Sequence, residues 1–259
     1  MEPDKFFIVP YRDRSYQLEI FINHMTKLME GEKYQILFIH QKDTRLFNRG
    51  AMKNIGFLYL KEKYPDSYKD KIIIFHDIDV LIAKKENTDF NTTKNIVKHN
   101  FGFKPTKNVK ALGGIVTIRV EDFEKTQGFL NLWTWGLEDN ALHKRCMREK
   151  LEIDYNSFNE LRCKEVIMFN TVKKTRKTNN DYSFENFKDT IDKNYGFQTI
   201  KNLNYSFENI RENAYFVNVN NFNTVGKYPN NIKEEIILTF QDPKIKEHNK
   251  KYGHFKKMF

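Results

Sequence analysis

The sequence predicts an α/β fold in which a mostly parallel central sheet carries helices on both faces. Three apolar segments, residues 6–10, 34–41 and 71–77, alternate with two helical segments, 15–31 and 49–63. Each apolar segment is a nearly continuous hydrophobic run, which is typical of strands buried on both faces of a parallel sheet. In such sheets ligands bind beyond the carboxyl ends of the strands.

Local signals support each of these elements. Pro10 ends the first strand, "FFIVP", because proline cannot donate to a sheet ladder. We expect Ser15 to cap the first helix and Gly31 to end it, and we expect the second helix to stop before Pro65. The apolar face of the first helix is formed by Leu18, Phe21, Ile22, Met25 and Leu28.

The pattern is less regular beyond residue 83. A polar stretch predicts a loop that leads into a short helix near residues 92–99. Two glycines then precede a strand at 115–120, and residues 138–150 are expected to be helical. The segment "KKTRKTNND", residues 173–181, is charged and has no apolar anchors, so it predicts a loop.

Length and composition favour one globular domain with a basic appendage. The chain has 259 residues, of which 39% are hydrophobic and 15% aromatic, enough for a sizeable core. We expect a domain over residues 1–222 and a C-terminal basic extension, 223–259, packed on it or trailing from it. The net charge of +10 favours anionic partners such as nucleotides. No recognised nucleic-acid motif is present, and we expect no nucleic-acid partner.

The sequence shows no targeting or membrane segment. No apolar run reaches the roughly 20 residues that a transmembrane helix needs. The first residues, "MEPDKFFIVP", lack the features of a signal peptide. Two cysteines, Cys146 and Cys163, make no disulfide framework. We therefore expect a cytoplasmic protein without a membrane span.

The third strand ends in a pair of aspartates within the stretch "HDID". Carboxylates are costly to bury unless they are paired, hydrogen-bonded or bound to a cation. Asp77 and Asp79 lie two residues apart, so in extended chain their side chains point the same way. They could hold one hard divalent cation, or a cation and a sugar hydroxyl. The alternative is a pair of capping or turn residues.

Arginines follow the first two strands at the same predicted edge. Arg12 and Arg14 lie in "VPYRDRS", and Arg49 lies at a helix start in "LFNRG". Arginine binds phosphate through two parallel hydrogen bonds, and helix N-termini favour anions. Surface ion pairing is the alternative for each arginine alone. The convergence of arginines and aspartates on three strand ends predicts metal-assisted binding of a nucleotide diphosphate.

A third cluster lies in "WTWGLEDNALHKR". Trp133 and Trp135 are the only tryptophans, and they precede Glu138 and Asp139 at a predicted helix start. Tryptophan faces beside carboxylates are suited to binding sugars. The alternative is that the tryptophans lie in the core and the acids complement the helix dipole.

Several of these stretches resemble motifs of the β-1,4-galactosyltransferase family in order and spacing. The matching stretches are "PYRDR", "FNRGAMKNIGF", "FHDIDVL", "FGF", "LGGI", "GF" and "WGLEDN". The resemblance covers residues 6–150 well and 150–220 weakly. It implies a GT-A fold with a Rossmann-like sheet, and an inverting transfer from a UDP-sugar to a glycan, usually with Mn²⁺.

The resemblance also assigns roles to individual residues. Asp139 would be the general base, with Glu138 beside it in the catalytic site. Asp79 would bind the metal, and Asp77 the ribose or the metal. The residues that would hold uridine and diphosphate are Pro10, Tyr11, Arg12, Arg14, Phe47 and Arg49. The residues that would frame the donor and acceptor sugars are Gly113, Gly114, Trp135, Glu138 and Asp139.

The sequence departs from the family pattern in three places. The family has a Met and a His three residues apart as further metal ligands; here Met168 could match, but Asn170 or Thr171 stands in place of the His. Metal binding is therefore expected to be weak or Mg²⁺-like. Ala111 replaces a tyrosine near the donor sugar, which predicts a pocket for a hexose or an N-acetylhexosamine, galactose or N-acetylgalactosamine first. Leu137 replaces a glycine.

The sequence thus predicts an inverting, UDP-sugar-dependent hexosyltransferase. Residues 173–187 correspond in position to the family's mobile loop. The alternative function is a catalytically inactive UDP- or glycan-binding module, which the missing His favours. A basic nucleic-acid-binding protein is a third possibility, but the predicted stripe of basic and aromatic residues is missing from the sequence.

Overall fold

The computed structural model of the chain describes residues 2–106, 110–133, 136–161, 163–168, 174–179, 195–225, 228 and 232–237, with 174–179 and 232–237 described by their backbone. All structural statements below concern these residues.

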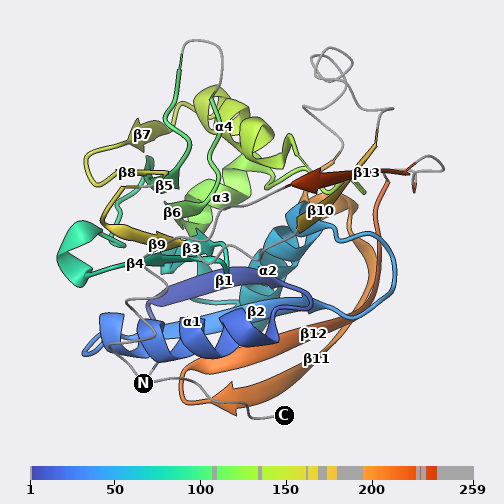
Figure 1. The fold of residues 1–259 in the computed structure, drawn as a ribbon, viewed down its shortest axis with the longest axis horizontal. Helices are drawn as coiled ribbons and strands as arrows, with labels where there is room; N and C mark the ends of the chain where they lie inside the picture. Colours follow the sequence, from blue (N-terminus) through green and yellow to red (C-terminus); the bar gives the residue numbers. More distant parts are fainter. Residues whose placement is uncertain are drawn as a thin grey trace.

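A nine-stranded mixed sheet forms the centre of the molecule (Figure 1). The strand order is β11-β12-β2-β1-β3-β6-β5-β7, and β8 pairs with β5. The strands are β1 (Lys5–Tyr11), β2 (Tyr34–Gln41), β3 (Ile72–His76), β5 (Ile96–Gly102), β6 (Ile115–Arg119), β7 (Glu152–Asp154), β8 (Asn159–Glu160), β11 (Lys201–Arg211) and β12 (Ala214–Asn223). Five pairings are parallel and three, β3–β6, β5–β6 and β11–β12, are antiparallel. The predicted mostly parallel sheet is confirmed.

Helices cover both faces of this sheet. Side chains of β1 alternate between two hydrophobic clusters, with Phe6 and Ile8 in one and Phe7 and Val9 in the other. The first cluster contains apolar residues of α2 (Arg49–Lys63), α3 (Val120–Thr126) and α4 (Glu138–Arg148), and the second those of α1 (Ser15–Leu28). Three short 3-10 turns complete the helical elements: η1 (Tyr68–Asp70), η2 (Lys85–Asn87) and η3 (Phe197–Thr199).

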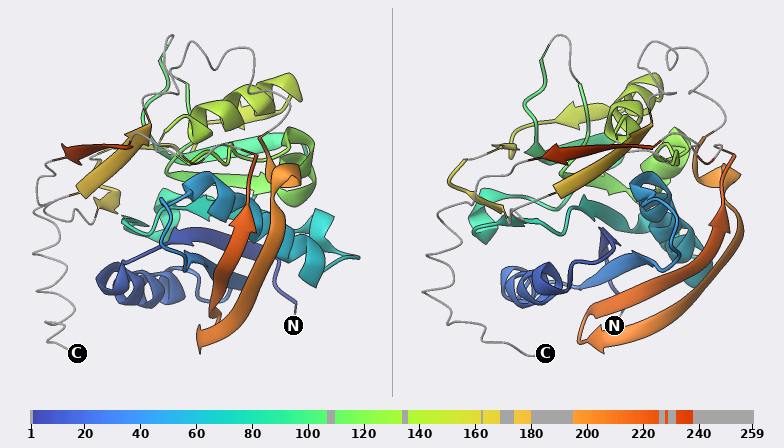
Figure 2. Two further views of the ribbon diagram at one scale, coloured as in Figure 1. Left: turned by 90° about the vertical axis from the view of Figure 1, so that its right-hand side faces the viewer. Right: turned by 45° about the vertical axis from the view of Figure 1, so that its right-hand side comes forward.

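Four more strands form two separate antiparallel pairs. β4 (Val80–Ile82) pairs with β9 (Val166–Met168), and β10 (Lys174–Asn179) pairs with β13 (Ile232–Ile237). Figure 2 shows these pairs beside the main sheet and the long β11–β12 hairpin that curves along its edge.

The predicted elements of the first eighty residues are confirmed, with three corrections. Pro10 pairs with Ile39 inside β1 and does not end the strand, and α1 ends at Leu28, before Gly31. β1, α1, β2, α2 and β3 occupy the expected segments. Ser15 is the first helical residue and not the cap: Arg14 stands at the N-cap position of α1, where its side chain makes no capping hydrogen bond.

Two later predictions are wrong. The short helix predicted near 92–99 is largely β5, whose residues pair with β6, β7 and β8. The loop predicted at 173–181 contains β10, which pairs with β13. In both cases the strand is stabilised by partners distant in sequence, and such pairing overrides local propensity.

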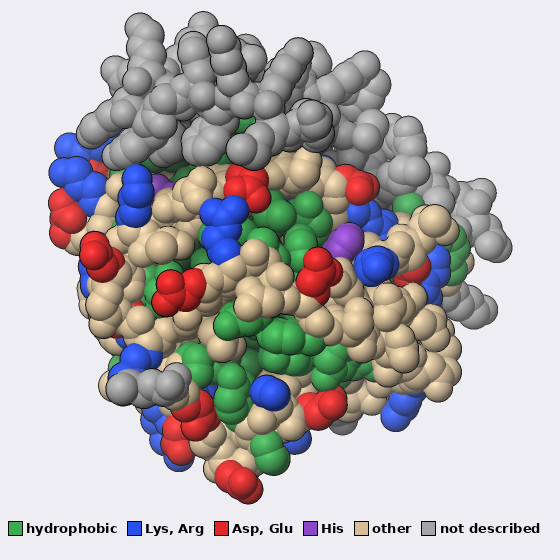
Figure 3. All heavy atoms as spheres, turned by 90° about the horizontal axis from the view of Figure 1, so that it is seen from below, with side chains coloured by type: hydrophobic (Ala, Val, Ile, Leu, Met, Phe, Trp, Pro, Cys, Tyr) green, Lys and Arg blue, Asp and Glu red, His purple; other side chains and the backbone are tan. Residues whose placement is uncertain are grey.

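The C-terminal extension, the expected lack of a membrane span and the surface remain to be described. β13 lies within the predicted extension 223–259 and pairs with a strand of the predicted domain; the domain boundary itself stays a prediction. Among the described residues, no helix has both the length and the apolar composition needed to cross a bilayer. Figure 3 shows one face of the molecule, where charged groups of both signs surround exposed hydrophobic side chains.

Candidate active site

The carboxyl ends of three parallel strands meet at one edge of the sheet. β1 pairs in parallel with both β2 and β3, so the residues that follow these strands lie at the same edge. β3 ends at His76, and Asp77 and Asp79 come directly after it. Arg49 begins α2, which follows the loop after β2. The strand topology therefore produces the convergence that the sequence predicts.

Arg49 links carboxylates from two distant parts of the chain. Its Nη2 donates to Asp77 Oδ1 at 2.6 Å, while its Nη1 donates to Glu138 Oε1 at 2.6 Å and to Asp139 Oδ2 at 2.9 Å. The Arg49 side chain is 18% exposed. One guanidinium thus holds the end of β3 against the start of α4.

Lys53 is a second cation at Asp139, and the sequence analysis did not find it. Its Nζ donates to Asp139 Oδ1 at 2.9 Å and lies 4.2 Å from the centre of the Phe129 ring. The side chain is only 1% exposed. Lys53 lies four residues after Arg49, so both side chains fall on the same face of α2. This spacing is the signal that could have found it.

These contacts set the protonation of the site. Burial alone would raise the pKa of Asp139, but the charges of Arg49 and Lys53 outweigh it and lower this pKa to about 2. Burial likewise opposes the charge of Arg49, yet Asp139, Asp77 and Glu138 raise its pKa above the ordinary value. Asp139 is therefore ionised at neutral pH and holds a cation on each oxygen.

The glycine pair before β6 lies against Asp139. A Cβ on Gly113 would stand 2.9 Å from Asp139 Cγ, and still closer to Oδ2. The backbone N–H of Leu112 donates to the backbone oxygen of Asp139 at 2.9 Å, and His99 Nε2 lies 2.9 Å from the Gly113 carbonyl oxygen. Gly114 has φ +75°, where a residue with a side chain would be strained. The close approach of backbone to carboxylate explains the glycine at 113.

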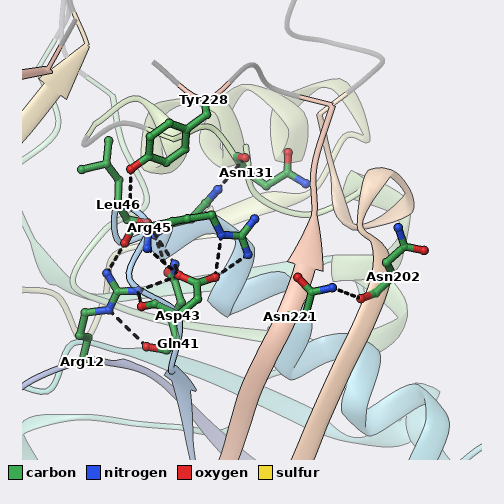
Figure 4. Close-up of polar contacts among 10 residues, drawn as sticks. Arg12, Gln41, Asp43, Arg45, Leu46, Asn131, Asn202, Asn221 and Tyr228 are labelled. Atoms are coloured by element: carbon green, nitrogen blue, oxygen red, sulfur yellow. Dashed lines mark hydrogen bonds and ion pairs between the residues drawn. The ribbon is translucent and has the colours of Figure 1, made fainter. Parts of the chain in front are cut away.

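Arg12 organises the loop that follows β2 (Figure 4). Its guanidinium donates to the backbone oxygens of Gln41, Asp43 and Arg45 at 3.2, 2.9 and 2.6 Å. It also lies 5.4 Å from the centre of the Phe47 ring. Arg12 and Phe47, two predicted nucleotide-binding residues, thus lie against each other, and Phe47 comes two residues before Arg49 in the chain.

Pro10, Tyr11 and Arg14, the remaining predicted nucleotide-binding residues, have other contacts. Tyr11 is 7% exposed and packs against Phe38 and Phe216, in the cluster on the α1 face of the sheet. Pro10 is buried within β1, and Arg14 donates to the backbone oxygen of Asp13 at 2.9 Å. None of these contacts is with a residue of the Arg49 cluster.

The two tryptophans have different outcomes. Trp133 is 3% exposed and stacks on Phe222, with ring centres 5.2 Å apart, while the guanidinium of Arg45 lies 4.5 Å from its ring centre. These contacts favour the alternative that Trp133 is a core residue. Trp135, the predicted sugar-binding residue, lies outside the described residues.

Asp77, Asp79 and Met168 are the described candidates for metal binding. Met168 is paired with Val80 in the β4–β9 ladder, so it lies beside the aspartate turn. Asn170 and Thr171 lie outside the described residues. Within the described part of the chain, no group of three or more His, Cys, Asp or Glu side chains could hold a metal. Two carboxylates do fit a hard cation whose other ligands are diphosphate and water oxygens, which is how Mg²⁺ is usually bound.

The fold is that of the GT-A glycosyltransferases. It matches the catalytic domain of Drosophila β-1,4-galactosyltransferase 7, in a mutant complex with manganese, UDP-galactose and xylobiose, with a TM-score of 0.64 and 22% identity over 84% of this chain and 93% of that one. At this identity the match shows the fold alone.

The chain belongs to the β-1,4-galactosyltransferase family. Residues 4–92 match the model for the N-terminal region of glycosyl transferase group 7, and residues 98–172 match the model for the N-terminal domain of galactosyltransferase. The chain is 30% identical to xylosylprotein 4-β-galactosyltransferase of Caenorhabditis elegans over 152 residues, 56% of this chain and 51% of that protein. It is 34% identical to human β-1,4-galactosyltransferase 6 over 147 residues, 53% and 37% of the two chains. The chain spans about half the length of these curated relatives, or less.

Proposed function

We propose that this chain is an inverting glycosyltransferase that moves a hexose or an N-acetylhexosamine from a UDP-sugar to a hydroxyl of a glycan. Galactose and N-acetylgalactosamine are the first candidates for this sugar. The observation that carries the proposal is the Arg49 cluster. It joins the aspartate turn after β3 to Glu138 and Asp139 at the start of α4. Nucleotide-side and sugar-side groups are thereby held in one site. Galactose is favoured as donor sugar by the names of the relatives.

The roles of the residues follow from their chemistry. An inverting transfer needs one base on the face of the sugar opposite the leaving group. Asp139 is ionised and takes the proton of the acceptor hydroxyl, and Glu138 accepts hydrogen bonds from sugar hydroxyls. Arg49 can exchange its carboxylate partners for the diphosphate, because a guanidinium binds either anion through two hydrogen bonds. Gly113 leaves room for substrate and base to approach.

A divalent cation, Mn²⁺ or Mg²⁺, would be held by Asp79 with Asp77 and would stabilise the negative charge of the departing diphosphate. Arg49 already occupies Asp77 Oδ1, so its move to the diphosphate would free that oxygen. Met168 would contribute its sulfur, which is a poorer ligand than oxygen for either ion. We infer a weakly bound metal that needs the nucleotide to complete its ligands.

Asp139→Asn tests the proposal in an assay of UDP release from a panel of UDP-sugars with glycan acceptors. Removing a general base costs on the order of 10²- to 10⁴-fold in rate, so transfer should collapse in this variant. Glu149→Gln is the matched control: it makes the same change at the end of α4, where Glu149 pairs with Arg148, and should keep full activity. UDP binding and thermal unfolding are measured in parallel. Transfer by Asp139→Asn within threefold of the unchanged protein would exclude Asp139 as the base.

The second candidate function is a catalytically inactive UDP- or glycan-binding module. It is favoured by the absence of histidine between residues 144 and 247 and by the cations that occupy both oxygens of Asp139. Saturable UDP binding without release from any donor, with Mn²⁺ or Mg²⁺ present, would establish this candidate. The cytoplasmic location stays a prediction.

A further inference from the structure

Lys53 is a buried charge whose role the proposed function leaves unassigned. Its side chain is 1% exposed on a helix that packs against the sheet. Burying an ammonium is costly unless it is paired and hydrogen-bonded. Its ion pair is with Asp139 Oδ1, and the face of the Phe129 ring adds a second favourable contact. A lysine this deeply buried, and paired with the proposed base, points to a role in the reaction.

The two cations on Asp139 are not equivalent. Arg49 also pairs with Glu138 and Asp77, and it lies at the sheet edge to which the proposed function assigns the diphosphate. An incoming diphosphate competes for Arg49 with these carboxylates. Lys53 donates to Oδ1 of Asp139, while Arg49 donates to Oδ2. When Arg49 turns to the diphosphate, Lys53 is the cation that stays on Asp139.

We propose that Lys53 is the positioning residue for the base: it fixes Asp139 through Oδ1 and keeps the carboxylate ionised, so that Oδ2 takes the acceptor proton. This inference rests on the proposed function. In the transfer step the acceptor oxygen bonds to the anomeric carbon, the bond from that carbon to the UDP oxygen breaks, and the hydroxyl proton passes to Oδ2. The electron pair of the broken bond leaves with UDP.

The surroundings of Asp139 define what a change at Lys53 does. Arg49 and Lys53 face it from α2, Glu138 precedes it on α4, and His99 of β5 bonds to the adjacent Gly113 carbonyl. Asp77 acts on the group through Arg49. With Lys53 removed and Arg49 on the diphosphate, negative Glu138 is the nearest charge. The carboxylate then takes up a proton at higher pH.

Lys53→Met removes the charge and keeps the length of the side chain. The expected result is UDP affinity within threefold, kcat lower by about tenfold, and an acidic limb of the kcat–pH profile shifted upward by about one unit or more, the usual effect of one close opposite charge. Lys53→Arg should restore part of kcat and the position of the limb. Lys61→Met is the matched control, because Lys61 lies on the same helix and pairs with Glu124 at the surface. It should change neither.

A second readout needs no activity. Carboxyl NMR titration of Asp139 should show a higher pKa in Lys53→Met than in the unchanged protein, and Lys53→Gln serves the same purpose if the methionine variant fails to fold. A raised pKa in a protein without transferase activity would support the role of Lys53 and defeat the proposed function. An unmoved pH limb together with an unmoved carboxyl titration would overturn the inference about Lys53.

Discussion

At the scale of single residues, the site is built from charges that need one another. Arg49 and Lys53 face three carboxylates, those of Asp77, Glu138 and Asp139, which leaves one net negative charge among these five groups. Removing one member of such a group leaves the charge of its partner unpaired in a partly buried site. A substitution here therefore changes stability as well as activity, and each test of function needs a measurement of folding beside it.

Gly113→Ala changes the site without touching a charge. The added Cβ would overlap the Asp139 carboxylate, which Arg49 and Lys53 prevent from moving freely. We expect a loss of transfer rate of about tenfold or more from displacement of the base, because misplacing a reacting group by about 1 Å can cost 10²-fold. UDP binding should change little. The measurement is kcat with saturating UDP-galactose.

Gly31→Ala separates this loss from a loss of stability. Gly31 has φ +80° and open space around its Cβ position, so alanine there costs about 1–2 kcal/mol of backbone strain away from the site. We expect a lower thermal midpoint with unchanged kcat. Equal kcat values for the two alanine variants would show that Gly113 does not position Asp139.

At the scale of elements, the sequence shows α2 as a helix but not how deeply it is buried. The sequence predicted residues 49–63 correctly as a helix. In the structure every residue from 50 to 57 is buried, because the segment around Phe129 and η3 covers the side of α2 that faces away from the sheet. Nothing local in the sequence announces this third layer. Lysine is normally a surface residue, so residue type gave no signal that Lys53 is buried.

Elements with a strong local pattern were predicted, and elements that depend on distant partners were not. Strands of the first eighty residues are continuous apolar runs, and the polar residues at their ends fall where parallel strands must meet, so the edge of the site followed from the sequence. β5 and β10 carry polar and charged residues and exist through pairing with strands far along the chain. Arg12 was predicted as a phosphate ligand from its place after the first strand and from the family motif; its bonds to three backbone oxygens of one loop depend on loop geometry.

Asn48 connects the start of α2 to the rest of the site. Its side-chain oxygen accepts a hydrogen bond from the Ala51 N–H at 2.9 Å, and its Nδ2 donates to the backbone oxygen of Asn131 at 2.8 Å. The Asn48 side chain is fully buried. Asn48→Ala should lower the free energy of unfolding by about 1–3 kcal/mol, since a cap and a buried hydrogen bond are both lost. Urea denaturation measures this.

Asn220→Ala is the control for the cap. Asn220 makes an exposed bond to Asn204 on the β11–β12 hairpin, and its loss should stay within about 0.5 kcal/mol. UDP binding should also weaken in Asn48→Ala and not in Asn220→Ala, because Asn48 caps the helix turn that begins with Arg49. Equal unfolding midpoints for the two variants would show that the cap contributes nothing to α2.

At the scale of the whole molecule, the charge of the site opposes the charge of the chain. The sequence carries a net charge of +10, which attracts anions such as UDP-sugars over long range. The Arg49 cluster is net negative, which favours a cation beside the nucleotide. On the face shown in Figure 3, positive and negative groups are mixed, which gives that face no strong preference for nucleic acid. A positively charged chain with a negatively charged site suits an anionic substrate that binds together with a divalent cation.

Acidification acts on the whole fold through its buried histidines. Burial is the largest cause that lowers the pKa of His76, to about 4, and the pKa values of His99 and His143. The pKa values of these histidines in the folded protein thus lie below the unfolded value of about 6.5. At a pH between the folded and unfolded pKa values, the unfolded chain binds more protons than the folded chain. The free energy of unfolding therefore keeps its full value above about pH 6.5 and decreases as the pH falls below it. For His99, which is 1% exposed, the slope can reach about 1.4 kcal/mol per pH unit.

Urea unfolding between pH 7.5 and 5 tests this prediction, because carboxylates with lowered pKa values act only below about pH 4. The free energy of unfolding should decrease with falling pH over this range. His99→Phe keeps the aromatic contacts with Tyr155 and Phe158 but loses the bond to Gly113, so it should be less stable throughout yet have a smaller slope. The slope, and not the absolute stability, is the decisive quantity. A stability that stays flat from pH 7.5 to 5, or an identical slope in His99→Phe, would mean that His99 accepts its proton within the folded protein.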